Sequence, residues 1–447
     1  MAVTESADTI YAEATMAGAA GVAIVRVSGP ASREILVGLT EKTPVPRVAR
    51  RVKLVSPSDR DIIDHGLVLW FPGPGSFSGE DVAEFHVHGG RAVVACLMEA
   101  IQEYPGVRLA EPGEFSRRAF MNGKLDLTEV EGLADLVASE TEAQRKQALR
   151  QLAGELGELY GSWRKRLLRS LAGVEAELDF VEEGLPSGLL DGVRGDLSGL
   201  LEELTEHLDD GRRGEIVRDG LRLVIGGPPN VGKSSLINLL CGKELSIVHH
   251  SEGTTRDVVE ARTQFAGFPV SISDTAGIRN TAGEVEREGI RRANVALKSA
   301  DVPILVFDAT EYLDVDGQAL ALLRHPGFIV FNKIDKVVGR EPSVIAGFPV
   351  RHVSCKTGEG IRDLIECLNV ETAEVMRRTE GPVLTRRRHR EALVRCKNRI
   401  QEALEVSDIE LFAEELRAAC YALGRITGRV GVEDILDLIF AEFCIGK

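Results

Sequence analysis

The sequence lacks any long hydrophobic run. None of its apolar stretches reaches the roughly 18 residues that cross a bilayer, so no membrane association is expected. Its opening residues, MAVTESADTIYAEA, also lack the basic and apolar regions of a secretory signal peptide. We therefore expect a cytoplasmic protein.

Paired cysteines are missing as well. The seven cysteines are Cys96, Cys241, Cys355, Cys367, Cys396, Cys420 and Cys444. They form no C-x-x-C pair and their number is odd, so neither a disulfide framework nor a zinc site is indicated.

Positive charge is scarce. The formal net charge is -15, whereas affinity for phosphate backbones comes from clustered Lys and Arg. The chain is therefore not a general nucleic-acid coat, and any contact with RNA must be local.

The first half of the chain has two regions with different residue patterns. A length of 447 residues predicts two to four domains. Residues 8–110 mix short β-rich runs with Gly/Pro turns, which predicts a compact α+β domain. Residues 113–185 contain no proline and carry apolar residues at three- and four-residue steps, which is typical of helices.

The second half predicts an α/β region with helices on both sides. A helix fits residues 189–209, and residues 211–214 resemble a linker. Short apolar strands at 221–225, 302–307, 328–331 and 350–353 then alternate with helix-length stretches, which predicts a mainly parallel sheet. After about residue 383 the helical texture returns, at 391–405, 410–427 and 432–443. The fold class is therefore multidomain α/β.

A phosphate-binding loop follows the strand at 221–225. Residues 227–234, GPPNVGKS, match G-x-x-x-x-G-K-[ST] and precede a helix at 235–240, the context that this motif requires. Its glycines let backbone N–H groups close around phosphates, Lys233 reaches the terminal phosphates, and the Ser234 hydroxyl binds Mg²⁺. This stretch predicts a nucleotide site.

Three further elements in the expected order predict guanine as the base. Asp274 begins a D-T-A-G stretch that ends at Gly277 and closes an apolar run, the position of a carboxylate that meets Mg²⁺ through water. Asn332 begins N-K-I-D, whose carboxylate at Asp335 can accept hydrogen bonds from guanine N1–H and the 2-amino group, a donor pair that adenine lacks. The stretch 354–356, SCK, can offer backbone N–H groups to guanine O6.

The means of hydrolysis is less usual. Ile278 stands directly after the D-T-A-G stretch, where Ras-like proteins place a water-orienting Gln. Phosphoryl transfer also needs positive charge at the β–γ bridge, which an arginine finger commonly supplies. Asn230 and the segment 247–257, IVHHSEGTTRD, are similar to potassium-dependent GTPases, in which K⁺ takes the place of the arginine. Thr255 would hold Mg²⁺, and Glu286 is one of several acids that could orient water.

Stretches outside the nucleotide-binding region extend the resemblance to the whole chain. Residues 21–29, 76–81, 88–90, 112–116, 119–126 and 443–447 look like signatures of the MnmE (TrmE) family of tRNA-modification GTPases. The resemblance implies an N-terminal tetrahydrofolate-binding and dimerisation domain over 1–119 and a helical domain made of 120–216 and 377–447. A Ras-like GTPase domain over 217–376 would be inserted into that helical domain.

The same resemblance implies a function. The family forms homodimers and assembles with an FAD-dependent partner, MnmG (GidA), into a heterotetramer that acts on tRNA. Together they add a carboxymethylaminomethyl or aminomethyl group at carbon 5 of the wobble uridine, using a one-carbon unit from a tetrahydrofolate (5-formyl- or 5,10-methylene-). K⁺-dependent pairing of two GTPase domains would activate hydrolysis, with Glu286 matching the family's catalytic glutamate.

The family's folate residues carry over to four positions, Arg26, Glu84, Lys124 and Lys447. A carboxylate can pair with the pterin's amino and ring N–H groups, and basic side chains suit its glutamate tail. Cys444 lies in the terminal signature and is either a participant in the chemistry or a packed thiol. His86 and His88 share a strand face, but no third ligand is apparent, so we favour a structural role over a metal pair.

The chain departs from the family in one loop. His249, His250, Ser251 and Glu252 stand before Gly253, where the family often has T-D-I-A. Backbone carbonyls there could still bind K⁺, and the imidazoles could make loop closure pH-dependent. The predicted K⁺ ligands are Asn230, His249, Ser251 and Thr254. The predicted GTP-binding set is Asn230, Val231, Gly232, Lys233, Ser234, Ser235, His249, His250, Ser251, Glu252, Gly253, Thr254, Thr255, Asp274, Thr275, Ala276, Gly277, Asn332, Lys333, Asp335, Ser354, Cys355 and Lys356, with Lys233, Glu286 and Cys444 as catalytic candidates.

Two questions stay open at the level of the sequence. A basic tract at 386–390, continued by Arg395, Lys397 and Arg399, is either a set of salt-bridge partners or a phosphate contact for tRNA. A ribosome-assembly GTPase of the Era or Der type would need an RNA-binding KH module after residue 370, and no G-x-x-G loop in such a setting is present. A pure nucleotide switch would need no folate site.

Overall fold

The computed structural model describes most of the chain. The described residues are 8–42, 44–179, 189–242, 260–274, 284–311, 317–339, 342–376 and 382–431, with 436, 437, 439, 440, 443 and 446 near the C-terminus. They divide into two compact units, one drawn from 1–137, 150–201 and 395–447 and the other from 138–149 and 202–394. The four-segment domain division remains a prediction.

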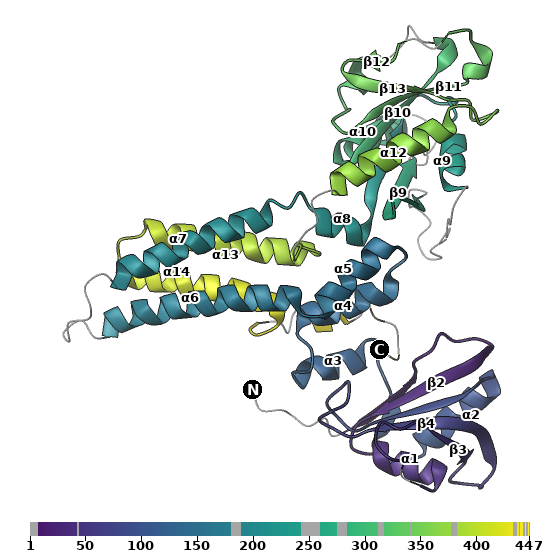
Figure 1. Cartoon of the computed structure of the whole chain (residues 1–447), viewed down its shortest axis with the longest axis vertical. Helices are drawn as coiled ribbons and strands as arrows, with labels where there is room; N and C mark the ends of the chain where they lie inside the picture. Colours follow the sequence, from purple (N-terminus) through teal and green to yellow (C-terminus); the bar gives the residue numbers. More distant parts are fainter. Residues whose placement is uncertain are drawn as a thin grey trace. The chain divides into compact units, whose positions relative to one another are not determined.

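The first unit contains a six-stranded sheet with strand order β3-β4-β5-β2-β1-β6 (Figure 1). Its strands are β1 (Thr9–Glu13), β2 (Ala20–Ser28), β3 (Arg50–Val55), β4 (Ile62–Phe71), β5 (Val82–Gly89) and β6 (Val107–Leu109). All neighbours are antiparallel except β1 and β6. The predicted α+β region is confirmed.

Alternation along β5 decides which face of this sheet is buried. Ala83, Phe85 and Val87 point into the core, and Glu84 and His86 point to the opposite face. Helices α1 (Ser32–Thr40) and α2 (Arg91–Gln102) cover the core face. On the opposite face, α3 (Glu114–Met121) contributes Phe115 to a small cluster with β1.

Long helices make up the rest of the first unit. They are α4 (Leu127–Ala138), α6 (Glu155–Asp179), the first part of α7 (Leu189–Leu208), the second part of α13 (Arg387–Glu405) and α14 (Ile409–Thr427). Helix α14 begins where the Asp408 carboxylate accepts hydrogen bonds from two backbone N–H groups and ends at Gly428 in the left-handed region. The helical texture predicted on both flanks is confirmed, whereas most of the helix predicted at 432–443 lies outside the described residues.

The second unit is built on a seven-stranded sheet with strand order β12-β13-β11-β10-β7-β9-β8. Its strands are β7 (Leu221–Gly226), β8 (Glu260–Phe265), β9 (Phe268–Asp274), β10 (Val302–Asp308), β11 (Phe328–Asn332), β12 (Val344–Ile345) and β13 (Phe348–His352). The five inner strands are parallel, and β8 and β12 pair antiparallel at the edges. This confirms the predicted mainly parallel sheet.

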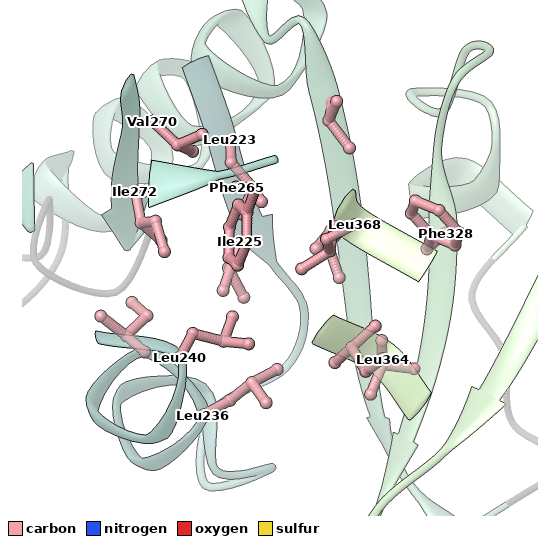
Figure 2. Packing of buried hydrophobic residues seen from close by; sticks show 14 of the residues in the cluster. Leu223, Ile225, Leu236, Leu240, Phe265, Val270, Ile272, Phe328, Leu364 and Leu368 are labelled. Carbon is pink, nitrogen blue, oxygen red and sulfur yellow. The ribbon is translucent and has the colours of Figure 1, made fainter. Parts of the chain in front are cut away.

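Helices cover both faces of that sheet. The helices of this unit, apart from the shared ends of α7 and α13, are α5 (Glu142–Leu152, most of which lies here), α8 (Arg213–Asp219), α9 (Lys233–Cys241), α10 (Glu284–Ser299), α11 (Gly317–Leu320) and α12 (Ile361–Met376). Leu236 of α9 and Leu364 of α12 pack with Ile225 of β7 in one cluster, which Figure 2 shows. Leu297 of α10 packs against the other face. Because both faces are covered, β10 and β11 are nearly continuous apolar runs.

The linker predicted at 211–214 is wrong in extent. The short helix α8 begins inside it, at Arg213, and occupies the chain up to Asp219. Ile216 and Val217 are buried in the cluster under β7, which gives this short segment an apolar face to pack. No helix of the described residues is long and apolar enough to cross a membrane.

Candidate functional site

The loop between β7 and α9 is shaped by two glycines. At Gly227, with φ of +135°, a Cβ would lie 2.1 Å from the Val306 carbonyl oxygen. At Gly232, with φ of +98°, a Cβ would lie 2.3 Å from Asn332 Nδ2. Only glycine fits such positions, because they combine a left-handed backbone with close contact. The loop is therefore packed tightly against β10 and β11.

Lys233 lies inside this loop, at the first residue of α9. Its Nζ donates to the carbonyl oxygens of Gly227, at 3.0 Å, and Pro228, at 2.7 Å, and the residue is only 6% exposed. An ammonium group held at a helix N-terminus, among backbone N–H groups, suits a phosphate ligand.

Two of the three side chains predicted at the Mg²⁺ site are adjacent, and the third, Thr255, lies outside the described residues. The Ser234 hydroxyl donates to Asp274 Oδ2 at 2.9 Å, so the start of α9 meets the end of β9. The Asp274 carboxylate is buried, and Mg²⁺ prefers oxygen ligands. The donor set therefore fits a magnesium ion, which would neutralise phosphate charge when bound.

Asn332 joins the phosphate loop to the loop at 354–356. Its Nδ2 donates to the Val231 carbonyl oxygen at 2.8 Å, and its Oδ1 accepts from the Cys355 N–H at 2.9 Å. The side chain is buried, so both hydrogen bonds are shielded from water. Sequence reasoning assigned Asn332 to the nucleotide and missed this connecting role.

The predicted base-recognition residues come together at the ends of β11 and β13. The Ser354 hydroxyl donates to Asp335 Oδ1 at 2.6 Å, and this hydrogen bond lowers the pKa of the Asp335 carboxyl. Asp335 is exposed, so it remains a charged acceptor that a base can reach. Lys333 donates to the Asn230 carbonyl oxygen at 2.8 Å and to Asp308 Oδ2 at 2.7 Å, which adds a second connection to the phosphate loop.

The remaining predicted nucleotide residues divide into two sets. Ser235 and Lys356 are exposed beside the site, and burial raises the pKa of the Cys355 thiol to about 11, which fits a backbone role. Residues outside the described set are His249, His250, Ser251, Glu252, Gly253, Thr254, Thr255, Thr275, Ala276, Gly277 and the neighbouring Ile278. Glu286 belongs to α10, but its side chain is outside the described part of the structure. The potassium site and the water-orienting residue therefore remain predictions.

Arg26 and Glu84 face each other on the outer face of the six-stranded sheet. They are register partners in β2 and β5, and both Arg26 Nε and an Arg26 terminal nitrogen lie 2.9 Å from Glu84 Oε1. The guanidinium lies over the rings of Phe77 and Phe115, with 5.8 Å and 5.7 Å to the ring centroids. A paired charge bordered by aromatic rings can hold a flat, polar ligand.

Lys124 lies next to the loop that carries Phe77. A Cβ at Gly79 would lie 3.4 Å from Lys124 Cγ, and Lys124 Nζ donates to the Pro74 carbonyl oxygen at 2.9 Å. Three of the four predicted folate residues thus gather around one loop, whereas Lys447 and Cys444 lie outside the described residues. Between them, Gly446 lies against the Glu13 backbone at the end of β1.

Arg118 is a supporting residue that sequence reasoning missed. It is only 7% exposed, and it donates to Glu80 Oε1 at 3.1 Å and to Asp8 Oδ1 at 2.9 Å. Glu80 also accepts from the Ser28 hydroxyl at 2.7 Å, two residues along β2 from Arg26. The signal in the sequence was an arginine four residues after Glu114 on a short helix, a spacing that places both on one face.

His86 and His88 face different carboxylates. His86 Nε2 lies 3.5 Å from Glu84 Oε2, and His88 Nδ1 lies 2.9 Å from Asp64 Oδ1. Within the described residues no group of three potential metal ligands occurs. These contacts support the structural interpretation of both histidines.

The basic tract at 386–399 is largely engaged with acidic side chains. Arg390 donates to Asp210 Oδ1 at 2.6 Å and to Glu215 Oε1 at 2.8 Å. Arg387 pairs with Glu391 at 2.7 Å, and Arg399 pairs with Glu402 and Glu415. Arg386 is buried. Of the two interpretations, salt-bridge partners are favoured for Arg387, Arg390 and Arg399.

Comparison with known proteins covers nearly the whole chain. The model of the GTP-binding protein TrmE N-terminus matches residues 9–124, and that of the MnmE helical domain matches 127–444. The tRNA modification GTPase MnmE of Parvibaculum lavamentivorans is 50% identical over 446 residues, covering 98% of this chain and 100% of the relative. The same enzyme of Paramagnetospirillum magneticum is 50% identical over 441 residues, covering 98% and 100%.

A mitochondrial protein is also similar. The 5-taurinomethyluridine tRNA synthase subunit GTPB3 of Homo sapiens is 46% identical over 461 residues, covering 99% of this chain and 94% of that protein. With two family models and full-length relatives in agreement, this chain belongs to the MnmE (TrmE) family of tRNA modification GTPases.

Proposed function

We propose that this chain is a K⁺-dependent GTPase that acts as a cytoplasmic homodimer, in a heterotetramer with an FAD-dependent partner of the MnmG type. The complex would add a carboxymethylaminomethyl or aminomethyl group to carbon 5 of the wobble uridine of certain tRNAs. GTP hydrolysis in tRNA modification follows from membership of the family. The potassium ion, the partner and the folate-derived carbon are the finer parts of the proposal.

The connection made by Asn332 is the observation that carries the proposal. It ties the phosphate loop to the loop that holds Asp335, so one nucleotide can be bound at both ends by parts that move together. Ser234 and Asp274 lie at the phosphate end, and Ser354 lies at the base end. An arrangement with a carboxylate acceptor at the base end supports guanine as the base.

The residues would act on GTP as follows. Lys233 would offset charge on the terminal phosphates, and Ser234 and Thr255, with Asp274 through water, would hold Mg²⁺. Because Ile278 cannot orient water, Glu286 would do so from α10. K⁺ held near Asn230 would supply the positive charge that an arginine finger supplies elsewhere.

A comparison of salts tests this mechanism. We expect GTP hydrolysis by the purified full chain with Mg²⁺ to be at least about tenfold faster in KCl than in NaCl, because charge at the β–γ bridge is worth several orders of magnitude. Glu286→Gln should remove the acceleration and leave GTP affinity unchanged, since its predicted role is limited to hydrolysis. Equal rates in the two salts would exclude K⁺ as the substitute for the arginine.

Folate binding is tested separately. Arg26→Ala and Glu84→Gln should each weaken binding of 5-formyl-tetrahydrofolate, measured by calorimetry, by about tenfold or more, because each removes a charged hydrogen-bonding group. His88→Ala is the matched control, since His88 lies on the same strand but pairs with Asp64. Unchanged binding in both site variants would remove the folate site from the proposal.

A further inference from the structure

A second basic tract lies in the first unit, and sequence reasoning did not single it out. Residues 42–58 contain Lys42, Arg47, Arg50, Arg51 and Lys53 and no Asp or Glu, in a chain whose formal net charge is -15. The tract runs from the end of α1 through the edge strand β3. Helix α1 packs on β3, as Figure 1 shows, so both ends of the tract belong to one surface.

The cations of this tract surround a hollow of about 340 Å³. It is lined by Thr40, Glu41, Lys42, Arg50, Arg51, Val52, Lys53, Val55 and Arg60. We call this surface the edge hollow. Arg47 is not part of it, because its guanidinium donates to the Gly75 carbonyl oxygen.

The charge of the edge hollow is mostly uncompensated. Its one carboxylate, Glu41, pairs with Arg60, so those two charges cancel. The side chains of Lys42, Arg50, Arg51 and Lys53 have no hydrogen bond or ion pair with another described residue. The C-terminus of α1 carries about half a negative charge, which offsets at most one of these four cations. A net positive charge of about three therefore remains in one small concavity.

One ordinary explanation accounts for only part of this. Charged side chains on an edge strand prevent pairing with other chains, and Arg51 and Lys53 would serve that purpose. An edge strand needs no further cation from the neighbouring helix end, however, and Lys42 lies there. Arg387, Arg390 and Arg399 of the tract at 386–399, by contrast, pair with acids of the same chain. Acids of the same chain thus compensate much of that tract, whereas the four cations of the edge hollow have no such pairs.

We propose that the edge hollow binds the phosphodiester backbone of the tRNA substrate. Unpaired arginines and lysines at a concave surface are complementary to closely spaced phosphates, and they give local affinity in a chain that otherwise repels RNA. Lys42, Arg50, Arg51 and Lys53, which all line the edge hollow, would contact phosphates there. The inference rests on the proposed function, because it assigns the surface through which this chain meets its RNA.

Charge reversal tests the proposal without removing the edge protection. Arg50→Glu with Arg51→Glu keeps two charges on β3, so the strand stays guarded, but it repels phosphates. Lys165→Glu with Arg169→Glu, on exposed positions of α6, is the control with the same change in net charge. Arg50→Lys with Arg51→Lys keeps the charges and should retain most of the affinity.

The readout is binding of an unmodified tRNA transcript to the full chain over a KCl series, by fluorescence anisotropy. The β3 double reversal should weaken binding at 50 mM KCl by about tenfold or more and reduce the slope of log affinity against log salt by about two, one per lost phosphate contact. The α6 control should change the slope by less than about half a contact. Folding of both variants is checked by chemical denaturation, in which their midpoints should match that of the wild-type chain.

Three results would overturn the inference. The first is a wild-type chain whose tRNA binding does not depend on salt. The second is an equal loss of tRNA affinity in the β3 variant and the α6 control. The third is a β3 variant that keeps its tRNA affinity but no longer binds the FAD-dependent partner, which would assign the surface to a protein. Failure of the proposed function looks different, since K⁺-independent hydrolysis and absent folate binding are measured without tRNA.

Discussion

Asn332 donates a hydrogen bond to the Val231 carbonyl oxygen at 2.8 Å, across 101 residues of sequence. The same carboxamide accepts from Cys355 N–H, so one buried side chain fixes the distance between the phosphate loop and the base loop. In this GTPase, recognition of the base and grip on the phosphates are therefore mechanically connected.

Asn332→Ala should break that connection. The Val231 carbonyl and the Cys355 N–H would lose their partner in a buried place, at a cost of about 2 kcal/mol in the stability of the second unit. We expect a lower urea midpoint and weaker GDP binding, measured by denaturation with and without nucleotide. Asn238→Ala, at an exposed position of α9, is the matched control and should change stability by less than about 0.5 kcal/mol. An unchanged midpoint for Asn332→Ala would contradict the bridging role.

Asp335→Asn should change which base is accepted. An amide offers one acceptor and one donor where the carboxylate offers two acceptors, so guanine's N1–H and 2-amino group lose a partner and GTP affinity should fall by about a hundredfold or more. Xanthine has an oxygen in place of the 2-amino group, so XTP should become the better ligand. Competition with a fluorescent nucleotide measures both. Ser354→Ala, which leaves the carboxylate in place, should weaken GTP without any gain for XTP.

Arg390→Met should destabilise the second unit strongly. It would remove the guanidinium that Asp210 and Glu215 share and leave Glu215 with Arg212 alone, and breaking a largely buried group of this kind costs about 3–5 kcal/mol. Arg387→Met is the same substitution in the same tract, at a side chain that is 86% exposed, and should cost less than about 1 kcal/mol. Chemical denaturation of both variants decides the point, and equal effects would refute a structural role for Arg390.

His207 should make stability depend on pH. Burial, with a smaller contribution from Arg390 and His389 that Asp210 opposes, lowers the pKa of His207 to about 4 from an ordinary value of 6.5. Between these two pKa values His207 is protonated in the unfolded chain and neutral in the folded chain. Stability therefore falls as the pH drops from 6.5 towards 4. The full loss for this shift is about 3 kcal/mol.

His207→Gln should remove that dependence. The stability of the variant relative to the wild-type chain should rise by about 2 kcal/mol between pH 7.5 and pH 4.5. Denaturation at several pH values measures the difference, in which the titration of other groups largely cancels. A difference that stays constant with pH would show that His207 is not the responsible group.

Much of the fold could be predicted because apolar runs and periodic helices report burial directly. The strand at 302–307 was predictable since both of its faces are covered and every residue from Val302 to Phe307 is buried. The helix α8 was not, because its seven residues are too few to show a period. Its stability comes from packing by Ile216, which is a tertiary effect.

The parts of the site formed by side chains of known motifs could be predicted. The contacts that a side chain makes with distant backbone atoms could not. Ser234 with Asp274, and Asp335 with Ser354, meet as their motifs predict. The double contact of Asn332 has no sequence signal, since its partners are main-chain groups. Charge runs were equally ambiguous, because Arg390 of the tract at 386–399 pairs with Glu215, which lies far away in the sequence.

Gly214 lies against Leu384, so closely that a Cβ at position 214 would be 2.3 Å from the Leu384 carbonyl oxygen. The segment before the nucleotide-binding sheet and the segment after it are therefore in contact, at Gly214 and Leu384. A stretch whose two ends touch adds little loop-closure entropy to the remainder of the protein, so it can be gained or lost as one block. A residue larger than glycine at position 214 would press on the Leu384 backbone and so disturb both ends of that stretch together.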